Sequence, residues 1–181
     1  MPHRTQKTKS LFRASTLAAL TAISLLSMPM VSQAAASTDV LQPGNYVESL
    51  GYKRYTQPYV LQRLTDRTYM VSVSTHNATF YVSESGVIVF DPLSNGYGQG
   101  VLDAISTVTE LPITALVYSH YHLDHLGDAP LFVDAAKKKG VKLRIIASAA
   151  VAQQVIDYGN VVPAPTDVIK ENPGSFTFDG L

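Results

Sequence analysis

The stretch YSHYHLDHLGD, residues 118–128, holds three of the five histidines of this chain within six positions, with an aspartate between them. It follows an apolar run at 113–119 that is typical of a buried strand. It precedes a helical pattern at 128–140 that opens with aspartate and proline and ends with glycine. Because ligands commonly bind outside the carboxyl ends of strands in helix-covered sheets, this stretch is the first candidate for a functional site.

The spacing within the stretch indicates a metal site. Alternate residues of an extended segment point the same way, so His120 and His122 are expected to face one ion while Tyr121 points away. The turn into the following helix should bring Asp124 and His125 to a neighbouring position. The chain has no cysteine, and three imidazoles with a carboxylate form a donor set that fits Zn²⁺ and tolerates Fe or Mn. We therefore predict metal ligation rather than a turn of histidines that hydrogen-bond to the backbone.

The segments around this stretch predict a sheet with helices packed on it. Residues 59–91 form β-rich runs broken by short polar turns, which is typical of an antiparallel meander. The pattern after Asp91 alternates between helix and strand. Helices are expected at 98–111, 128–140 and 149–159, and strands at 113–119, 143–148 and 175–180. The predicted class is α/β (α+β).

The first 34 residues are typical of a secretory signal peptide. They combine a basic start without acidic residues, an apolar run at 16–31 and the small-residue site SQA at 32–34. We expect cleavage near Ala34, a periplasmic or secreted protein, and no stable membrane association afterwards; an uncleaved anchor is the alternative. Residues 35–58 are polar and rich in turn residues, so they are expected to form an arm packed on one domain at 59–181.

The charge balance excludes some partners. The leader holds four of the 14 basic residues and none of the 14 acidic ones, so the remainder carries a formal net charge of −4. No basic stripe remains to indicate binding of nucleic acid. The predicted partner is a small-molecule substrate.

The motif HYHLDH (120–125) resembles the His-x-His-x-Asp-His motif of the metallo-β-lactamase superfamily. The preceding ATFYVSESGVIVFDP (78–92) resembles the hairpin of that family that ends in a buried aspartate. The resemblance covers about Tyr59 to Leu181 and implies an αββα sandwich with a metal site at one edge of the paired sheets.

The resemblance also implies roles for individual residues. His120 and His122 would ligate a first zinc ion, and Asp124 and His125 a second. Asp91 would brace the metal loop, and its alternative role is to cap the loop after its strand. The implied chemistry is hydrolysis of an ester, lactone, lactam, thioester or similar bond by a metal-bound hydroxide, because zinc lowers the pKa of its water to about 7. Asp124 would be the catalytic residue that orients this water or accepts its proton.

The site is short of ligands by this comparison. The family has further ligands downstream, but no histidine follows His125. His76 is expected to be a solvated hairpin residue. We therefore interpret the chain as the N-terminal half of the sandwich, C-terminally incomplete and inactive alone. The alternatives are a metal-binding fragment or interaction protein without catalysis, and an iron-dependent sulfur oxygenase of the same fold.

Overall fold

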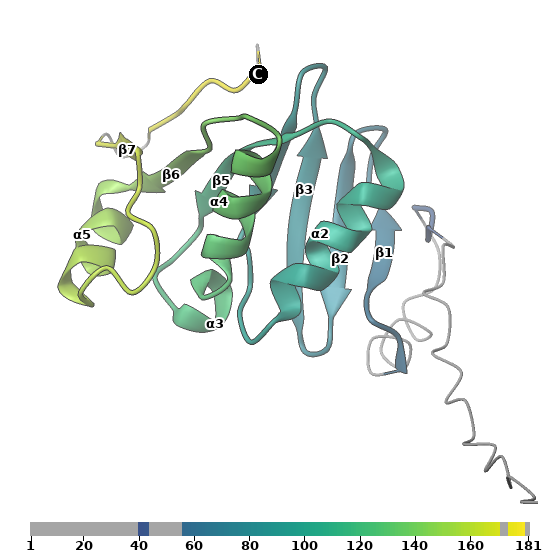
Figure 1. The fold of residues 1–181 in the computed structure, drawn as a ribbon, viewed down its shortest axis with the longest axis horizontal. Coiled ribbons are helices and arrows are strands. Elements are labelled where there is room, and N and C mark those ends of the chain that lie inside the picture. The colour runs from purple at the N-terminus through teal and green to yellow at the C-terminus, as the bar shows by residue number, and fades with distance from the viewer. Residues whose placement is uncertain (1–39, 44–55, 171–173, 180–181) are drawn as a thin grey trace, which may run out of the picture. The chain divides into compact units, whose positions relative to one another are not determined.

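A computed structural model describes residues 40–43, 56–170 and 174–179 and shows one sheet of seven strands in chain order (Figure 1). The first four strands pair antiparallel, and β4 to β7 pair parallel. The strands are β1 (Val60–Arg63), β2 (Thr68–Val73), β3 (His76–Val82), β4 (Val87–Phe90), β5 (Ile113–Tyr118), β6 (Arg144–Ser148) and β7 (Asp167–Ile169). The predicted α/β class is confirmed.

The helices cover one face of this sheet. They are α2 (Tyr97–Val108), the one-turn α3 (Leu123–Leu126), α4 (Ala129–Lys138) and α5 (Ala149–Asp157). Figure 1 shows α2 and α4 lying across the same face of the strands. Alternation along the strands explains the core: Val87 and Val89 are fully buried in the cluster under the helices, whereas Ile88, between them, belongs to a smaller cluster on the opposite face. Both faces are apolar, as expected for parallel strands.

The predicted final strand at 175–180 is wrong. Residues 174–179 form no strand; the aromatic side chain of Phe178 packs instead on the sheet face opposite the helices, beside Ile88. The Asp179 carboxylate fixes the segment by accepting hydrogen bonds from the backbone N–H and hydroxyl of Ser85, at 3.1 and 2.9 Å. The alternation of Phe176 and Phe178 thus correctly indicates a segment with one apolar side. The segment is not a strand because it pairs with no strand among the described residues.

The last strand of the sheet is β7, a three-residue segment that sequence reasoning missed. It pairs parallel with β6, and the Arg144 guanidinium binds the Asp167 carboxylate at 2.8 Å across the two strands. A run this short has no measurable periodicity, so only its pairing identifies it.

Part of the predicted arm packs on the sheet. Leu41 forms a parallel bridge beside β1: its N–H donates to Leu61 O at 2.9 Å, and its C=O accepts from Arg63 N at 2.7 Å. The predicted signal peptide and most of the arm lie outside the described residues. Within the described ranges, none of the helices has the length and apolar character needed to cross a membrane.

Candidate metal centre

The site is built where two adjacent parallel strands end. The carboxylate of Asp91, just after β4, accepts a hydrogen bond from Ser119 N at 2.9 Å and one from Ser119 Oγ at 2.5 Å, just after β5. Asp91 takes a left-handed conformation with φ 57°, which aspartate tolerates better than most residues. These bonds join the two strand ends and so fix the start of the histidine-rich loop.

The loop continues as a short helix that begins earlier than predicted. His122 has extended backbone angles and stands at the N-cap of α3, so Asp124 and His125 lie in the helix. The backbone of the loop after β4 fastens this turn: Leu93 N donates to His125 O, and Asp128 N donates to Leu93 O, both at 2.8 Å. The prediction that the chain turns into a helix after His122 is confirmed. That helix is the four-residue α3, separate from the longer helix predicted at 128–140.

Close packing explains the glycine that follows. A Cβ on Gly127 would lie 2.8 Å from Ser94 Cβ and 2.9 Å from Leu123 O. The side chain of Asp128 does not cap its own helix: its Oδ2 accepts from Gly98 N at 2.8 Å, in the first turn of α2. Helix α2 is thereby tied to the end of the histidine-rich loop.

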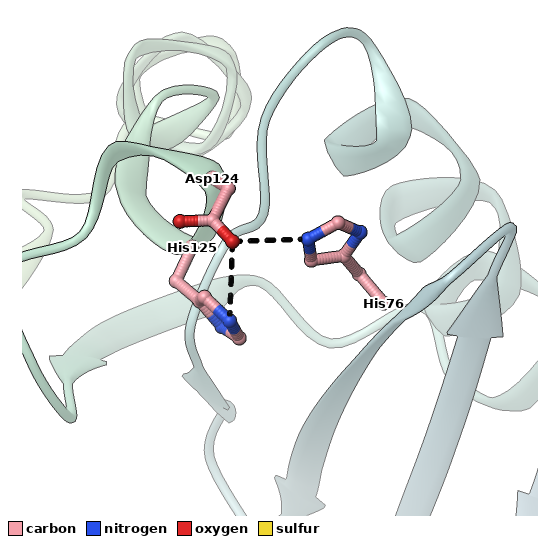
Figure 2. Close-up of side chains that lie close together, drawn as sticks. All are labelled: His76, Asp124 and His125. Atoms are coloured by element: carbon pink, nitrogen blue, oxygen red, sulfur yellow. Dashed lines mark hydrogen bonds and ion pairs between the residues drawn. The ribbon is translucent and has the colours of Figure 1, made fainter.

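The side chains of three residues converge, as Figure 2 shows. Asp124 Oδ2 lies 3.1 Å from His76 Nε2 and 3.7 Å from His125 Nε2. The hydrogen bond with His76 is the main cause that lowers the pKa of Asp124 below its ordinary value. His76 comes from the start of β3, and its side chain is only 21% exposed. His76 is therefore a hairpin residue as expected, but its ring is partly buried and held by Asp124 rather than freely solvated.

Asp91 lies beside the other face of the cluster. Its Oδ2 is 3.5 Å from His125 Nδ1 and 4.0 Å from His120 Nδ1. The His125 Nδ1 atom is buried and makes no hydrogen bond to any described residue. A buried polar atom without a partner is costly, and the Asp91 carboxylate is the group within reach that could accept a hydrogen bond from it.

Two groups of side chains offer donor atoms that all lie within 4.8 Å of one another, and His125 belongs to both. One group is His76, Asp124 and His125; the other is Asp91, His120 and His125. Each group thus contains two of the four predicted ligands: Asp124 with His125 in the first, and His120 with His125 in the second. Nitrogen and oxygen donors without thiolate fit Zn²⁺, so the residues present are compatible with the ion that the sequence predicts.

His122 is the predicted ligand that lies outside both groups. It is exposed, and its ring centroid is 4.9 Å from that of His120 in an edge-on arrangement. The two rings are neighbours, and their joint ligation of one ion stays a prediction. Tyr121 stacks on Tyr158 at 5.5 Å between ring centroids, but its ring also lies 4.8 Å from that of His122, so it does not turn fully away from the histidines.

The family is defined by comparison with known proteins. Residues 71–179 match the family model of the metallo-beta-lactamase superfamily, so the chain belongs to this superfamily. Its fold is similar to the crystal structures of the metallo-beta-lactamases IND-7 and DIM-1. Their TM-scores are 0.52 and 0.53 and their identities 23% and 16%. The similarity covers 67% and 68% of this chain and 56% of each neighbour. These likenesses confirm the predicted fold.

The chain is also similar to curated alkylsulfatases. The chain is 29% identical over 163 residues to a linear primary-alkylsulfatase of Pseudomonas sp, across 67% of this chain and 24% of the relative. It is 30% identical over 82 residues to an (R)-specific secondary-alkylsulfatase of Pseudomonas sp, across 44% of this chain and 12% of the relative. The chain thus spans at most about a quarter of these relatives. Its relatives and structural neighbours are enzymes.

Proposed function

We propose that this chain supplies the metal centre of a zinc-dependent hydrolase that acts on alkyl sulfate esters. The observation that carries the proposal is that His125, at the carboxyl edge of the sheet, shares one group of donor atoms with Asp124 and another with His120. The similarity to a linear primary-alkylsulfatase supports the substrate class. Lactams, lactones and thioesters are the competing substrates within the superfamily.

The residues divide the work by their exposure and contacts. His120, His122, Asp124 and His125 would hold the zinc ions, which supply Lewis acidity and lower the pKa of bound water to about 7. Asp91, which is 13% exposed, would support His125, since its Oδ2 lies 3.5 Å from His125 Nδ1. The Asp124 side chain is 50% exposed, so it can reach solvent and substrate, orient the attacking water and accept its proton.

The test of this function is sulfate release by the longest natural form of the protein. We expect a linear primary alkyl sulfate to be hydrolysed, the activity to be lost on chelation, and zinc to restore it. Asp124→Asn should abolish turnover, whereas Asp103→Asn, on the exposed side of α2, should not. Reloading the metal-free protein with iron instead of zinc and measuring turnover distinguishes the hydrolase from the alternative, an iron-dependent sulfur oxygenase. Sulfate release that survives chelation, or hydrolysis of a lactam in preference to the sulfate ester, would overturn the proposal.

We further propose export to the periplasm or the medium, supported by the basic start and the apolar run at 16–31. The mature protein is expected to begin near Ala35. N-terminal sequencing of protein from the exporting cell measures this directly. A cytosolic product that retains Met1 would contradict the proposal.

A further inference from the structure

We infer that His76 is a metal ligand and completes a three-donor set with Asp124 and His125. This inference rests on the proposed function in one respect, because it takes Asp124 and His125 as ligands. It adds a nitrogen donor from outside the histidine-rich motif, 48 residues from Asp124 along the chain. The set then lies wholly within the part of the chain that the structure describes.

The distances between the donor atoms suit a single ion. Metal–ligand bonds of about 2.0–2.2 Å in a tetrahedral site place neighbouring donor atoms about 3.3–3.6 Å apart. The distance from Asp124 Oδ2 to His76 Nε2 is 3.1 Å, and that to His125 Nε2 is 3.7 Å. These two distances differ from those of a tetrahedral site by only a few tenths of an ångström, and all three donor atoms lie within 4.8 Å of one another.

The imidazole ring of His76 is oriented as that of a ligating histidine usually is. A ligating histidine commonly has its second ring nitrogen fixed by a hydroxyl, carboxylate or carbonyl group. His76 Nδ1 meets this condition at 2.9 Å from Thr75 Oγ1, whereas His125 Nδ1 has the Asp91 carboxylate 3.5 Å away but makes no hydrogen bond to a described residue. In each ring it is therefore Nε2 that faces Asp124, as Figure 2 shows for His76.

The backbone holds His76 in this position. Val73 and His76 are partners in the β2–β3 register, so a turn of two residues separates the strands. The His76 ring lies 5.9 Å from that of Tyr97 and 5.5 Å from that of His125 between centroids. A short hairpin with packed neighbours limits the conformations the side chain can adopt, which favours ligation.

A hydrogen bond to Asp124 is the competing role for His76, and one pair of variants separates the two. Glutamine can donate a hydrogen bond to the carboxylate but is a poor zinc ligand, whereas alanine can do neither. The experiment compares His76→Gln and His76→Ala in the 181-residue chain by equilibrium dialysis against zinc and by the visible absorption of the cobalt-substituted protein. Asn77→Ala, on the same strand, is the matched control.

We expect both His76 variants to bind zinc at least about tenfold more weakly than the unchanged chain, and Asn77→Ala to bind as the unchanged chain does. Free imidazole should restore the cobalt spectrum of His76→Ala. Circular dichroism of the metal-free proteins verifies that each variant is folded. Retained affinity in His76→Gln alone would make His76 a hydrogen-bond partner and overturn the inference.

His125→Ala separates failure of this inference from failure of the proposed function. Loss of zinc in His125→Ala with full retention in both His76 variants would overturn the ligand role of His76 and leave the proposed metal centre intact. An unchanged chain that retains no zinc would overturn the inference, since three donors in this geometry should hold an ion. Zinc-independent sulfate release by the natural protein would instead overturn the proposed function.

Discussion

The histidine-rich loop at 119–128 and the hairpin turn at 73–76 each bring an imidazole to Asp124, but by different means. The loop carries its donors within six positions of the chain. Asp91 accepts a hydrogen bond from Ser119 N and Leu93 N donates one to His125 O, so both hold the loop from the end of the neighbouring strand. The hairpin carries a single donor, His76, placed by the pairing of β2 with β3. Donors on one loop form a motif that is visible in sequence, whereas a donor placed by strand pairing becomes visible only when the register is known.

The largest effect should come from His125, which belongs to both donor groups. We expect His125→Ala to weaken zinc binding by more than about 100-fold, beyond the range of 10–100-fold typical of residues that only support a ligand. His122→Ala should cost less, because His122 lies outside both groups. Isothermal titration of the metal-free chain measures both, and equal losses would show that His122 moves into the centre when zinc binds.

The second-largest effect on zinc binding should come from Asp91, which lies beside the histidine-rich loop. Asp91→Asn keeps a side chain that tolerates the left-handed backbone but removes the charge 3.5 Å from His125 Nδ1. The expected loss of zinc affinity is about 10–100-fold. Competition with a chromogenic chelator provides the measurement, with Asp103→Asn as the control for a lost carboxylate. Unchanged affinity would leave Asp91 only its role in joining the ends of β4 and β5.

The close packing of the loop predicts a smaller effect on the fold. Gly127→Ala should lower the free energy of unfolding by about 1–3 kcal/mol, because the methyl group would crowd Ser94 and the carbonyl of Leu123. It should also weaken zinc binding by displacing α3. Gly140→Ala is the comparison: it meets nothing within 4 Å but has φ +73°, so it should lower stability without affecting zinc. Denaturant unfolding measures the stability of both variants, and zinc titration measures their affinity. Equal zinc affinity in the two variants would contradict the prediction for Gly127.

The hairpin should show the smallest effect. Ser74, the first residue of the turn, has φ 52°, a conformation that costs an L-residue about 1–2 kcal/mol. Ser74→Gly removes this cost but gains freedom in the unfolded chain, so we expect a net increase in unfolding free energy of under about 1 kcal/mol. Zinc affinity should not change. A loss of stability in thermal unfolding would mean that the serine side chain holds the turn in a way the backbone angles do not show.

The sequence is sufficient to predict most of the fold because its strong patterns are long. The apolar run before Ser119 and the helical spacing after Asp91 each extend over a whole element, and β5 and α2 lie where they were expected. The errors fall on short segments. Strand β7 and helix α3 are three and four residues long, so tertiary contacts rather than periodicity determine them.

The candidate site was predictable where its residues form a motif in the sequence. His125 lies close to both Asp124 and His120, because the spacing of the motif determines this once the chain turns into α3. His76 could not be found in this way, since its surroundings in sequence are those of any hairpin. A count of histidines could have indicated His76. It is the one histidine outside the motif once the predicted leader is set aside.

Leu41 closes part of the outer edge of the sheet. An uncovered edge strand offers unpaired N–H and C=O groups to other molecules, and this favours aggregation. The N–H and C=O of Leu41 both bond to the edge of β1. A protein cut after Ala34 keeps this cover, whereas a truncation that starts at residue 44 removes it, and we expect only the second to associate during size-exclusion chromatography. The position of the proteolytic cut thus determines how much of the β1 edge is left open to other molecules.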